Sequence, residues 1–383
     1  MEEVPNILWV VTTQWRASAW GGGGDKQACT PNLDQLATEG LVYRQATTPH
    51  PFGPFARAAM LTGVPSPENG VCDYFDPLPT RSETIAHRMT TRGYDTAWFG
   101  KWHLAKRDPQ APLVGEAHAR MVVAEAARGG FEYWEGFESG FLLHDPWLHG
   151  TRYPEPMRVK GYQSDVLADT AIDWVQTREQ VPWFAVVSIE APHPPYGAAV
   201  PEEIERVNSA NLRRPDNVPV EVWPRAAAEL AGYYTHIAAT DRAIGRLVRG
   251  MGKTTVVVVT SVHGDMHGAH GLFRKGWPYE ESVRVPLMVR GAPHEEAGSI
   301  SDGPVSLLDM GAMTLAWSEG RKWESEREWA PISMPSVVKL PDQCDRVWSG
   351  RRSMKHKEIR RADGSPWLEF DLQADPGEQR SLV

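Results

Sequence analysis

Basic and imidazole side chains recur in this sequence directly after apolar runs that are typical of β-strands. Lys101 and His103 follow the run Thr96–Phe99, and His193 follows Phe184–Ile189. A lysine can hold an anionic group, and an imidazole can exchange a proton near neutral pH. Functional groups concentrate on the segments that follow regular elements. The segments that contain these residues are therefore the places to search for a functional site.

The apolar runs alternate with amphipathic segments, as they do in α/β proteins. This alternation predicts a mostly parallel sheet flanked by helices, with ligands at the carboxyl ends of its strands. The predicted strands are Ile7–Val11, Thr96–Phe99, Phe184–Ile189, Thr254–Thr260 and Val285–Val289. The predicted helices run from Pro31 to Gly40, from a Ser82 cap to Gly93, through Leu167–Val175, through Ala226–Val248 and through Val305–Trp317.

The pattern changes toward the C-terminus, where two short strand candidates flank the turn Ala362-Asp363-Gly364. We therefore expect an α/β domain over residues 1–340 and a small C-terminal antiparallel subdomain, packed on it, over residues 341–383. Residues 107–160 and 195–225 are rich in Pro, Gly, His and Trp. We interpret both as long loops that could cover the site.

The charge balance excludes some classes of partner. The 383 residues carry a net charge of -9, which argues against nucleic acid and anionic membranes, since both need a broad basic surface. No apolar run has the length of a membrane-spanning helix. Strand character begins at Asn6, so we expect no signal peptide and a cytoplasmic protein. The three cysteines are widely spaced and form no disulfide or metal framework.

Eight segments occur along the chain in a characteristic order. In that order they resemble the formylglycine-dependent sulfatases of the alkaline phosphatase superfamily, over almost the whole length. The resemblance implies the alkaline phosphatase fold, a mostly parallel sheet between helices. The segments are Pro5–Gln14, Thr30–Leu41, Arg57–Gly63, Gly100–Leu104, Ala191–Tyr196, Thr260–Gly276, Tyr279–Leu287 and Asp371–Glu378.

The resemblance fails at the residues that carry the family's chemistry. Two consecutive aspartates of the family's metal site are here Thr13 and Gln14, and the residue that becomes formylglycine is Gly53. The third metal aspartate is Val262, followed by His263. A Ca²⁺ or Mg²⁺ site needs several hard oxygen ligands, and glycine cannot form the covalent sulfo-enzyme. We therefore expect no metal ion and no other cofactor.

The cationic and imidazole positions of the family are retained. Arg57, Lys101, His103, His193 and Lys275 each match a position that contacts the sulfate or supports the nucleophile and leaving group. We predict that Arg57 binds the substrate. Catalysis is assigned to the other four and to the added imidazole of residue 263. Loss of the metal together with its carboxylates keeps the pocket charge roughly balanced.

Several other residues are candidates for the site, and for most of them a structural role is an alternative. Thr13 and Gln14 either line the pocket as neutral hydrogen-bonding groups or fill space. Gly53 either frees room for a larger ligand or is a turn glycine. His50 is a candidate extra acid or base, and Trp102 is either a pocket wall or core.

A replacement zinc site is a further alternative. His263, His267, His270 and Asp265 lie close in sequence, but their spacing fits no standard motif. We leave this alternative open.

Three functions remain. The first is a metal-independent enzyme that acts on a small sulfate, sulfonate, phosphate or carboxylate by elimination, isomerisation or transfer. The second is a non-catalytic anion-binding pseudoenzyme. The third is residual ester hydrolysis, in which His50 or a water activated by His263 attacks. Retention of the imidazoles favours the first, because binding alone could use lysine and arginine.

Overall fold

The main body is built on one ten-stranded sheet. The computed structural model describes residues 4–178, 181–252 and 254–383. The strand order is β10-β2-β9-β8-β1-β7-β3-β4-β5-β6. The run from β8 to β4 is parallel, whereas β9 and β5 are antiparallel to their neighbours. The strands are β1 Ile7–Thr12, β2 Leu41–Thr47, β3 Asp95–Lys101, β4 Tyr133–Phe137, β5 Trp147–Gly150, β6 Met157–Arg158, β7 Trp183–Ser188, β8 Val256–Ser261, β9 Leu287–Arg290 and β10 Ser299–Ser306.

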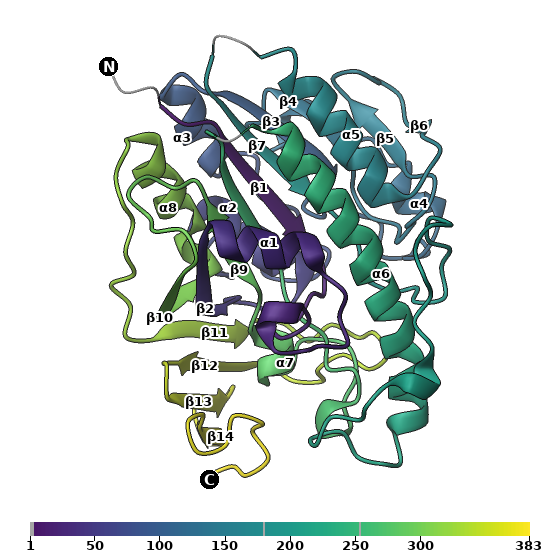
Figure 1. Ribbon diagram of the computed structural model, residues 1–383, viewed down its shortest axis with the longest axis vertical. Coiled ribbons are helices and arrows are strands. Elements are labelled where there is room, and N and C mark those ends of the chain that lie inside the picture. The colour runs from purple at the N-terminus through teal and green to yellow at the C-terminus, as the bar shows by residue number, and fades with distance from the viewer. Residues whose placement is uncertain (1–3, 179–180, 253) are drawn as a thin grey trace.

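Helices cover both faces of this sheet (Figure 1). One face carries α1, α5 and α6, and the other carries α2, α3 and α8. The predicted mostly parallel α/β architecture is confirmed. The helices are α1 Pro31–Glu39, α2 Gly53–Thr62, α3 Ile85–Thr91, α4 Glu116–Ala119, α5 Gln163–Val175, α6 Trp223–Gly250, α7 Glu280–Val283 and α8 Met310–Ser318, with short 3₁₀ turns η1 Gly21–Gly23, η2 Glu125–Ala127, η3 Ser209–Asn211, η4 Ala269–Gly271 and η5 Leu307–Asp309.

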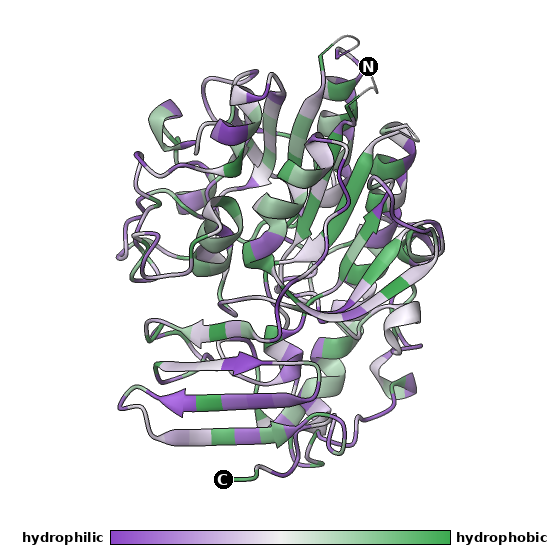
Figure 2. Ribbon diagram, turned by 90° about the vertical axis from the view of Figure 1, so that its left-hand side faces the viewer, coloured by the Kyte–Doolittle hydropathy of each residue, from purple (hydrophilic) through white to green (hydrophobic). Residues whose placement is uncertain are grey.

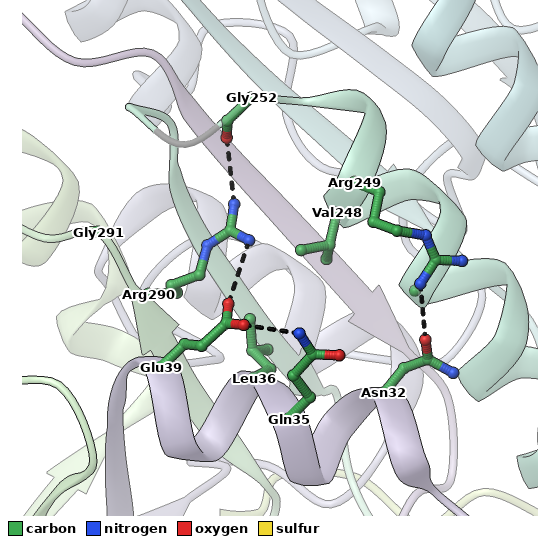
Figure 3. Close-up of a pocket in the computed structure, with 10 residues that line it drawn as sticks. Asn32, Gln35, Leu36, Glu39, Val248, Arg249, Gly252, Arg290 and Gly291 are labelled. Atoms are coloured by element: carbon green, nitrogen blue, oxygen red, sulfur yellow. Dashed lines mark hydrogen bonds and ion pairs between the residues drawn. The ribbon is translucent and has the colours of Figure 1, made fainter.

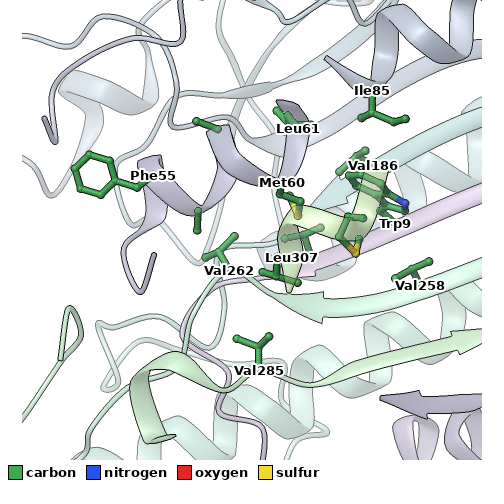
Figure 4. Close-up of a cluster of buried hydrophobic side chains, with 14 of the residues drawn as sticks. Trp9, Phe55, Met60, Leu61, Ile85, Val186, Val258, Val262, Val285 and Leu307 are labelled. Atoms are coloured by element: carbon green, nitrogen blue, oxygen red, sulfur yellow. The ribbon is translucent and has the colours of Figure 1, made fainter. Parts of the chain in front are cut away.

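The core lies in two layers, one on each face of the sheet. Along β1, Trp9 and Val11 pack into the layer under α2, α3 and α8, while Leu8 and Val10 pack into the layer under α1, α5 and α6. This alternation explains the continuous apolar run, because a strand buried on both faces has no solvent side. Figure 4 shows part of the first layer, and it includes Val262.

Three predictions about secondary structure are wrong. Helix α3 is capped by Thr84, not Ser82, because the Thr84 hydroxyl accepts from Ala86 and His87 closes a capping box. Residues 305–306 end β10 before the helical turn η5 begins. The region 107–160 is not only loop, since it contributes β4, β5 and β6. These strands are short, and short strands give little periodic signal.

A separate four-stranded antiparallel sheet lies at the C-terminal end of the molecule (Figure 2). Its strands are more hydrophilic than those of the main sheet. It confirms the predicted small antiparallel sheet. The boundary after residue 340 stays a prediction, and the first strand of this sheet lies before it. The strands are β11 Ala330–Met334, β12 Trp348–Arg352, β13 His356–Arg361 and β14 Pro366–Asp371.

Buried polar contacts join the two sheets. The Trp348 indole of β12 donates to the Gly276 carbonyl at 2.8 Å. The Ser333 amide of β11 donates to the Pro49 carbonyl at 2.8 Å, so the small sheet contacts the loop that precedes α2. Among the described helices, none is both long and apolar enough to cross a membrane.

Candidate functional site

A cavity of about 320 Å³ opens at the carboxyl ends of β1, β3, β7 and β8. Its position is the one expected for a parallel sheet, because side chains that follow these strands converge there. Phe52, Tyr74 and Phe141 form much of the apolar wall. Seven of the predicted site residues line it, namely Thr13, Gly53, Lys101, His103, His193, His263 and Lys275.

Arg57 lies one helical turn after Gly53 and is fully buried behind this cavity. Its Nη2 donates to the Thr13 hydroxyl at 3.0 Å and to the Ser188 hydroxyl at 3.4 Å. Its Nε and Nη1 have no hydrogen-bond partner among the described residues. A Cβ placed on Gly53 would lie 3.2 Å from Nη1. Burial lowers the pKa of Arg57 to about 10, so the guanidinium stays charged at neutral pH and keeps unused donors for an anion.

Lys101 and Glu190 form a buried ion pair at the floor of the site. Their atoms Nζ and Oε1 are 2.5 Å apart, and both side chains are buried. Burial lowers the pKa of Lys101 to about 8, while Glu190 opposes this shift. Glu190 was missed from the sequence, although it follows β7 directly in a segment where functional groups are expected.

Two imidazoles line the cavity, and only the Nε2 atom of His263 lacks a partner among the described residues, since that of His193 faces Lys275. His193 Nδ1 lies 2.7 Å from the Pro194 carbonyl, and His263 Nδ1 lies 2.9 Å from the Gly264 carbonyl. A carbonyl oxygen can only accept, so in both residues Nδ1 carries the hydrogen and Nε2 is the basic atom. Burial lowers the pKa of both residues well below the ordinary value, with Lys275 adding to the effect. Both are therefore neutral bases at pH 7.

His103 faces the position of the missing nucleophile. It adopts a left-handed backbone conformation with φ of 60° and stands edge-on to the Tyr74 ring. Within the described part of the chain, neither ring nitrogen has a hydrogen-bond partner. Burial and the nearby Arg107 lower the pKa of His103 well below its ordinary value. Its Nδ1 would lie 2.9 Å from a Cβ on Gly53, so the imidazole fills the space beside that glycine.

Lys275 and Gln14 belong to a buried chain of hydrogen bonds. Lys275 Nζ donates to Gln14 Oε1 at 2.5 Å and to His193 Nε2 at 3.1 Å. The Gln14 amide donates in turn to Asp265, which also accepts from the Tyr196 hydroxyl at 2.6 Å. Gln14 therefore holds the Lys275 amine on one side and a carboxylate on the other.

These contacts leave no site for a divalent cation at the end of β1. The Thr13 hydroxyl already bonds a guanidinium and a backbone carbonyl, and Gln14 Oε1 already bonds an amine. Val262 is packed in the core (Figure 4). His263 offers one nitrogen. Because Ca²⁺ and Mg²⁺ need several oxygen ligands, these residues do not fit the family's metal.

The proposed zinc cluster does not assemble. His270 stacks on Tyr279 and lies 4.0 Å from Glu281, away from the cavity. His267 faces Asp265 at 3.7 Å and Tyr196 at 3.3 Å. The one group of potential metal ligands found in the described residues is a different set that joins His270 to Glu281 and Glu378.

Four predicted site residues do not line the cavity: Arg57 and Gln14 are buried and contact its lining residues Thr13 and Lys275, whereas His50 and Trp102 have partners elsewhere. His50 is fixed between backbone groups, because its Nδ1 faces the Ser333 carbonyl at 3.2 Å and its Nε2 accepts from the Ser66 amide at 2.8 Å. It therefore has no nitrogen left for catalysis. Trp102 packs edge-on against Trp98 in the core at 4.8 Å between ring centroids. For Trp102 the core reading holds.

A buried acidic residue close to the site, Glu138, could not be predicted from the sequence. Glu138 accepts from the amides of Leu104 and Ala105 and lies 3.3 Å from Arg107, whose guanidinium stacks on Tyr74. Burial raises the pKa of Glu138 to about 7. This residue follows β4, a strand that the sequence did not reveal, so no signal pointed to it.

A cavity of about 540 Å³ lies elsewhere, between α1, the end of α6 and the end of β9 (Figure 3). Most of its polar groups pair with one another, although Arg290 Nε has no hydrogen-bond partner among the described residues. Arg290 bonds the Gly252 carbonyl at 3.2 Å and lies 3.7 Å from Glu39, and Arg249 donates to Asn32 at 3.0 Å. The larger cavity therefore offers less unpaired polarity than the smaller one.

A family model described as "Sulfatase" matches residues 5–320. The chain belongs to the sulfatase family. An ulvan-active sulfatase from Formosa agariphila is 29% identical over 412 residues, which cover 99% of this chain and 77% of that protein. An arylsulfatase from Clostridium perfringens is 25% identical and covers 99% of this chain and 90% of that protein. A solved putative sulfatase from Bacteroides fragilis superposes with a TM-score of 0.85 at 22% identity, covering 100% of this chain and 92% of the other.

Within the sulfatase fold, the departure is therefore local. The scaffold and the cationic positions stay, while Gly53 and Gln14 stand where the resemblance places the nucleophile and a metal ligand. Arg57 Nη1 lies beside Gly53, and His193 and His263 line the same cavity as that glycine.

Proposed function

We propose that this sulfatase-family chain is a metal-independent enzyme that binds a small oxyanion and moves a proton of the same molecule. Sulfate, sulfonate, phosphate and carboxylate groups all fit the cationic contacts. The observation that carries the proposal is the presence of unused Arg57 donors beside Gly53 together with two Nε2 atoms at the cavity, that of His263 without a partner among the described residues and that of His193 facing Lys275. A buried donor without a partner costs about 1–3 kcal/mol, and a bound anion removes that cost.

The residues divide into two roles. Arg57 and Lys101 hold the anion and stabilise negative charge that develops beside it. His263 accepts a proton at Nε2, which has no partner among the described residues, and His193 exchanges protons through the Nε2 that faces Lys275. Proton abstraction next to an anionic group leads to elimination or isomerisation, and these reactions need neither a metal nor a nucleophile at Gly53.

Binding is tested first, by titration calorimetry with sulfate, phosphate and methanesulfonate in the presence of EDTA. We expect at least one anion to bind equally well with and without the chelator. Arg57→Met removes two charge-assisted contacts and should weaken binding about 10- to 100-fold. Binding that disappears with EDTA and returns with Ca²⁺ would overturn the metal-independent site.

Proton transfer is tested separately. A panel of small sulfonates, sulfates, phosphates and carboxylates is incubated in D₂O, and NMR follows deuterium uptake at carbon. We expect uptake into at least one compound, reduced about 100-fold or more in His193→Asn and His263→Asn. His294→Asn changes an exposed imidazole outside the cavity and is the matched control.

Two further outcomes would favour the two alternative functions. Tight anion binding with neither deuterium uptake nor turnover would overturn catalysis and favour the anion-binding pseudoenzyme. Release of inorganic sulfate or phosphate without deuterium uptake would instead show hydrolysis by a water that His263 activates. His50 is excluded as the attacking group by its two backbone contacts.

A further inference from the structure

Lys275 is held in the cavity with its amine in an unusual setting. The side chain is 7% exposed and lines the cavity wall. Its Nζ donates to Gln14 Oε1 at 2.5 Å and to His193 Nε2 at 3.1 Å. The carboxylate of Asp265 is one step farther away, on the other side of the Gln14 amide. Lys275 is therefore held by two neutral acceptors.

The number of acceptors matches a neutral amine. An ammonium has three N–H donors, whereas a neutral amine has two donors and a lone pair. Two acceptors face Nζ, and the described residues supply no third. A neutral Lys275 would thus have both hydrogens bonded and its lone pair directed to the cavity. Lys101 differs, because its Nζ contacts a carboxylate.

The electrostatic surroundings also favour the neutral form. Burial lowers the pKa of Lys275 to about 7, and the charges of Lys101 and Arg274 add to this effect while Asp265 opposes it. At pH 7 its free-amine fraction is therefore about a thousandfold larger than that of an ordinary lysine. A desolvated lysine beside other cations is a setting in which amines become nucleophiles.

We propose that Lys275 forms an imine with its substrate, and that this substrate carries an aldehyde or ketone carbon close to its anionic group. This inference rests on the proposed function, since the same cations hold the anion. The apolar walls Phe52 and Phe141 support it because they limit access of water to the C=N bond. Nζ lies 5.4 Å from the Phe52 ring centroid.

The covalent step is a condensation that releases one water. The Nζ lone pair forms a bond to the carbonyl carbon, and the C=O π pair moves to oxygen. A proton passes from nitrogen to that oxygen, with His193 Nε2 placed to carry it. As the C–O bond then breaks, the second proton passes from nitrogen to the departing hydroxyl, so that water leaves and a nitrogen electron pair forms the C=N bond. No oxidant, reductant or metal is needed.

Reductive trapping tests the imine. The wild-type protein is treated at pH 7 with glyoxylate, which joins a carboxylate to an aldehyde, and with sodium cyanoborohydride. Peptide mass mapping should find Lys275 carrying the mass of glyoxylate less one oxygen, at least about tenfold above any other lysine. Acetaldehyde, which lacks the anionic group, should label Lys275 at least about tenfold less. Excess sulfate should compete with glyoxylate.

Two variants complete the experiment. Lys275→Met keeps the aliphatic chain and should lose the specific adduct, whereas Lys355→Met, on an exposed lysine, should retain it. Mapping of the wild type keeps the test valid if Lys275→Met folds poorly. Labelling that is spread evenly over surface lysines, or that is absent from Lys275, would overturn the imine. If sulfate still binds in that case, the proposed function stands. Failure of sulfate, phosphate and methanesulfonate alike to bind the wild-type protein would overturn both.

Discussion

The atoms around Gly53 leave little room for a side chain at this position. A Cβ there would lie 2.9 Å from His103 Nδ1 and 3.2 Å from Arg57 Nη1. Real Cβ atoms do not approach other atoms at the shorter distance without displacement. The glycine is therefore part of the packing. The Arg57 guanidinium and the His103 imidazole occupy the volume that a nucleophilic side chain would need.

The substitution Gly53→Ala should destabilise the protein by about 1–3 kcal/mol, because the new methyl group pushes His103 or Arg57 from its position. Denaturant unfolding measures the change. The matched control is Gly311→Ala in α8, where the nearest atom to a new Cβ is 4.0 Å away. That control should gain up to about 1 kcal/mol from helix propensity. Equal effects of the two substitutions would contradict the clash.

At the scale of elements, the loop before α2 is anchored to the small sheet by one imidazole. His50 Nδ1 faces the Ser333 carbonyl of β11, and Nε2 accepts from the Ser66 amide. Both nitrogens are committed to one tautomer, so a proton on Nε2 would break the contact with Ser66. Burial lowers the pKa of His50 to about 4.

This anchor should make stability depend on pH. The unfolded chain protonates His50 near pH 6.5, while the folded chain does so only near pH 4. The folded pKa of this base is depressed, so its contribution is full above pH 6.5 and is lost as the pH falls toward 4. We expect the loss of unfolding free energy between pH 7 and pH 4 to be about 3 kcal/mol smaller in His50→Asn than in the wild type. Urea unfolding at both pH values measures this, and parallel losses would refute it.

On the scale of the whole molecule, buried charges join the small sheet to the main body. Lys357 Nζ of β13 lies 2.8 Å from Glu280 of α7 and also contacts Glu378 of the C-terminal tail. Arg352 of β12 adds a 2.9 Å contact to Glu280. These pairs add to the apolar contacts through which Ile332, Met334, Trp348 and Ile359 join the main core.

Lys357→Met should destabilise the protein by about 3–5 kcal/mol, because it leaves the buried carboxylate of Glu378 without its cation and removes one of the cations around Glu280. Arg351→Met is the control on the same sheet, since Arg351 pairs with Glu358 at 3.0 Å on the exposed side. That change should cost less than about 1 kcal/mol. Chemical denaturation compares the two variants. A cost for Lys357→Met no larger than that of the control would show that the buried pair is not what attaches the sheet.

The sequence by itself determined the scaffold and the composition of the site. Apolar runs and amphipathic periods depend on neighbouring residues, so β1, β7 and α6 could be predicted from local patterns. The segments that follow the predicted strands contain most of the predicted residues that line the cavity. The residue types at Gln14 and Gly53 also led to the prediction that the family's metal ligands and nucleophile are missing.

Only the tertiary structure decided what each of these side chains does. Lys275 meets Gln14 across 261 residues, and Lys101 meets Glu190 across 89. Contacts over such separations leave no periodic trace in the chain, and they determine charge, tautomer and pKa. The same lack of local signal hid the backbone contacts of His50. Residue type supplies the chemistry that a side chain can perform, whereas its buried partners select one of those chemistries.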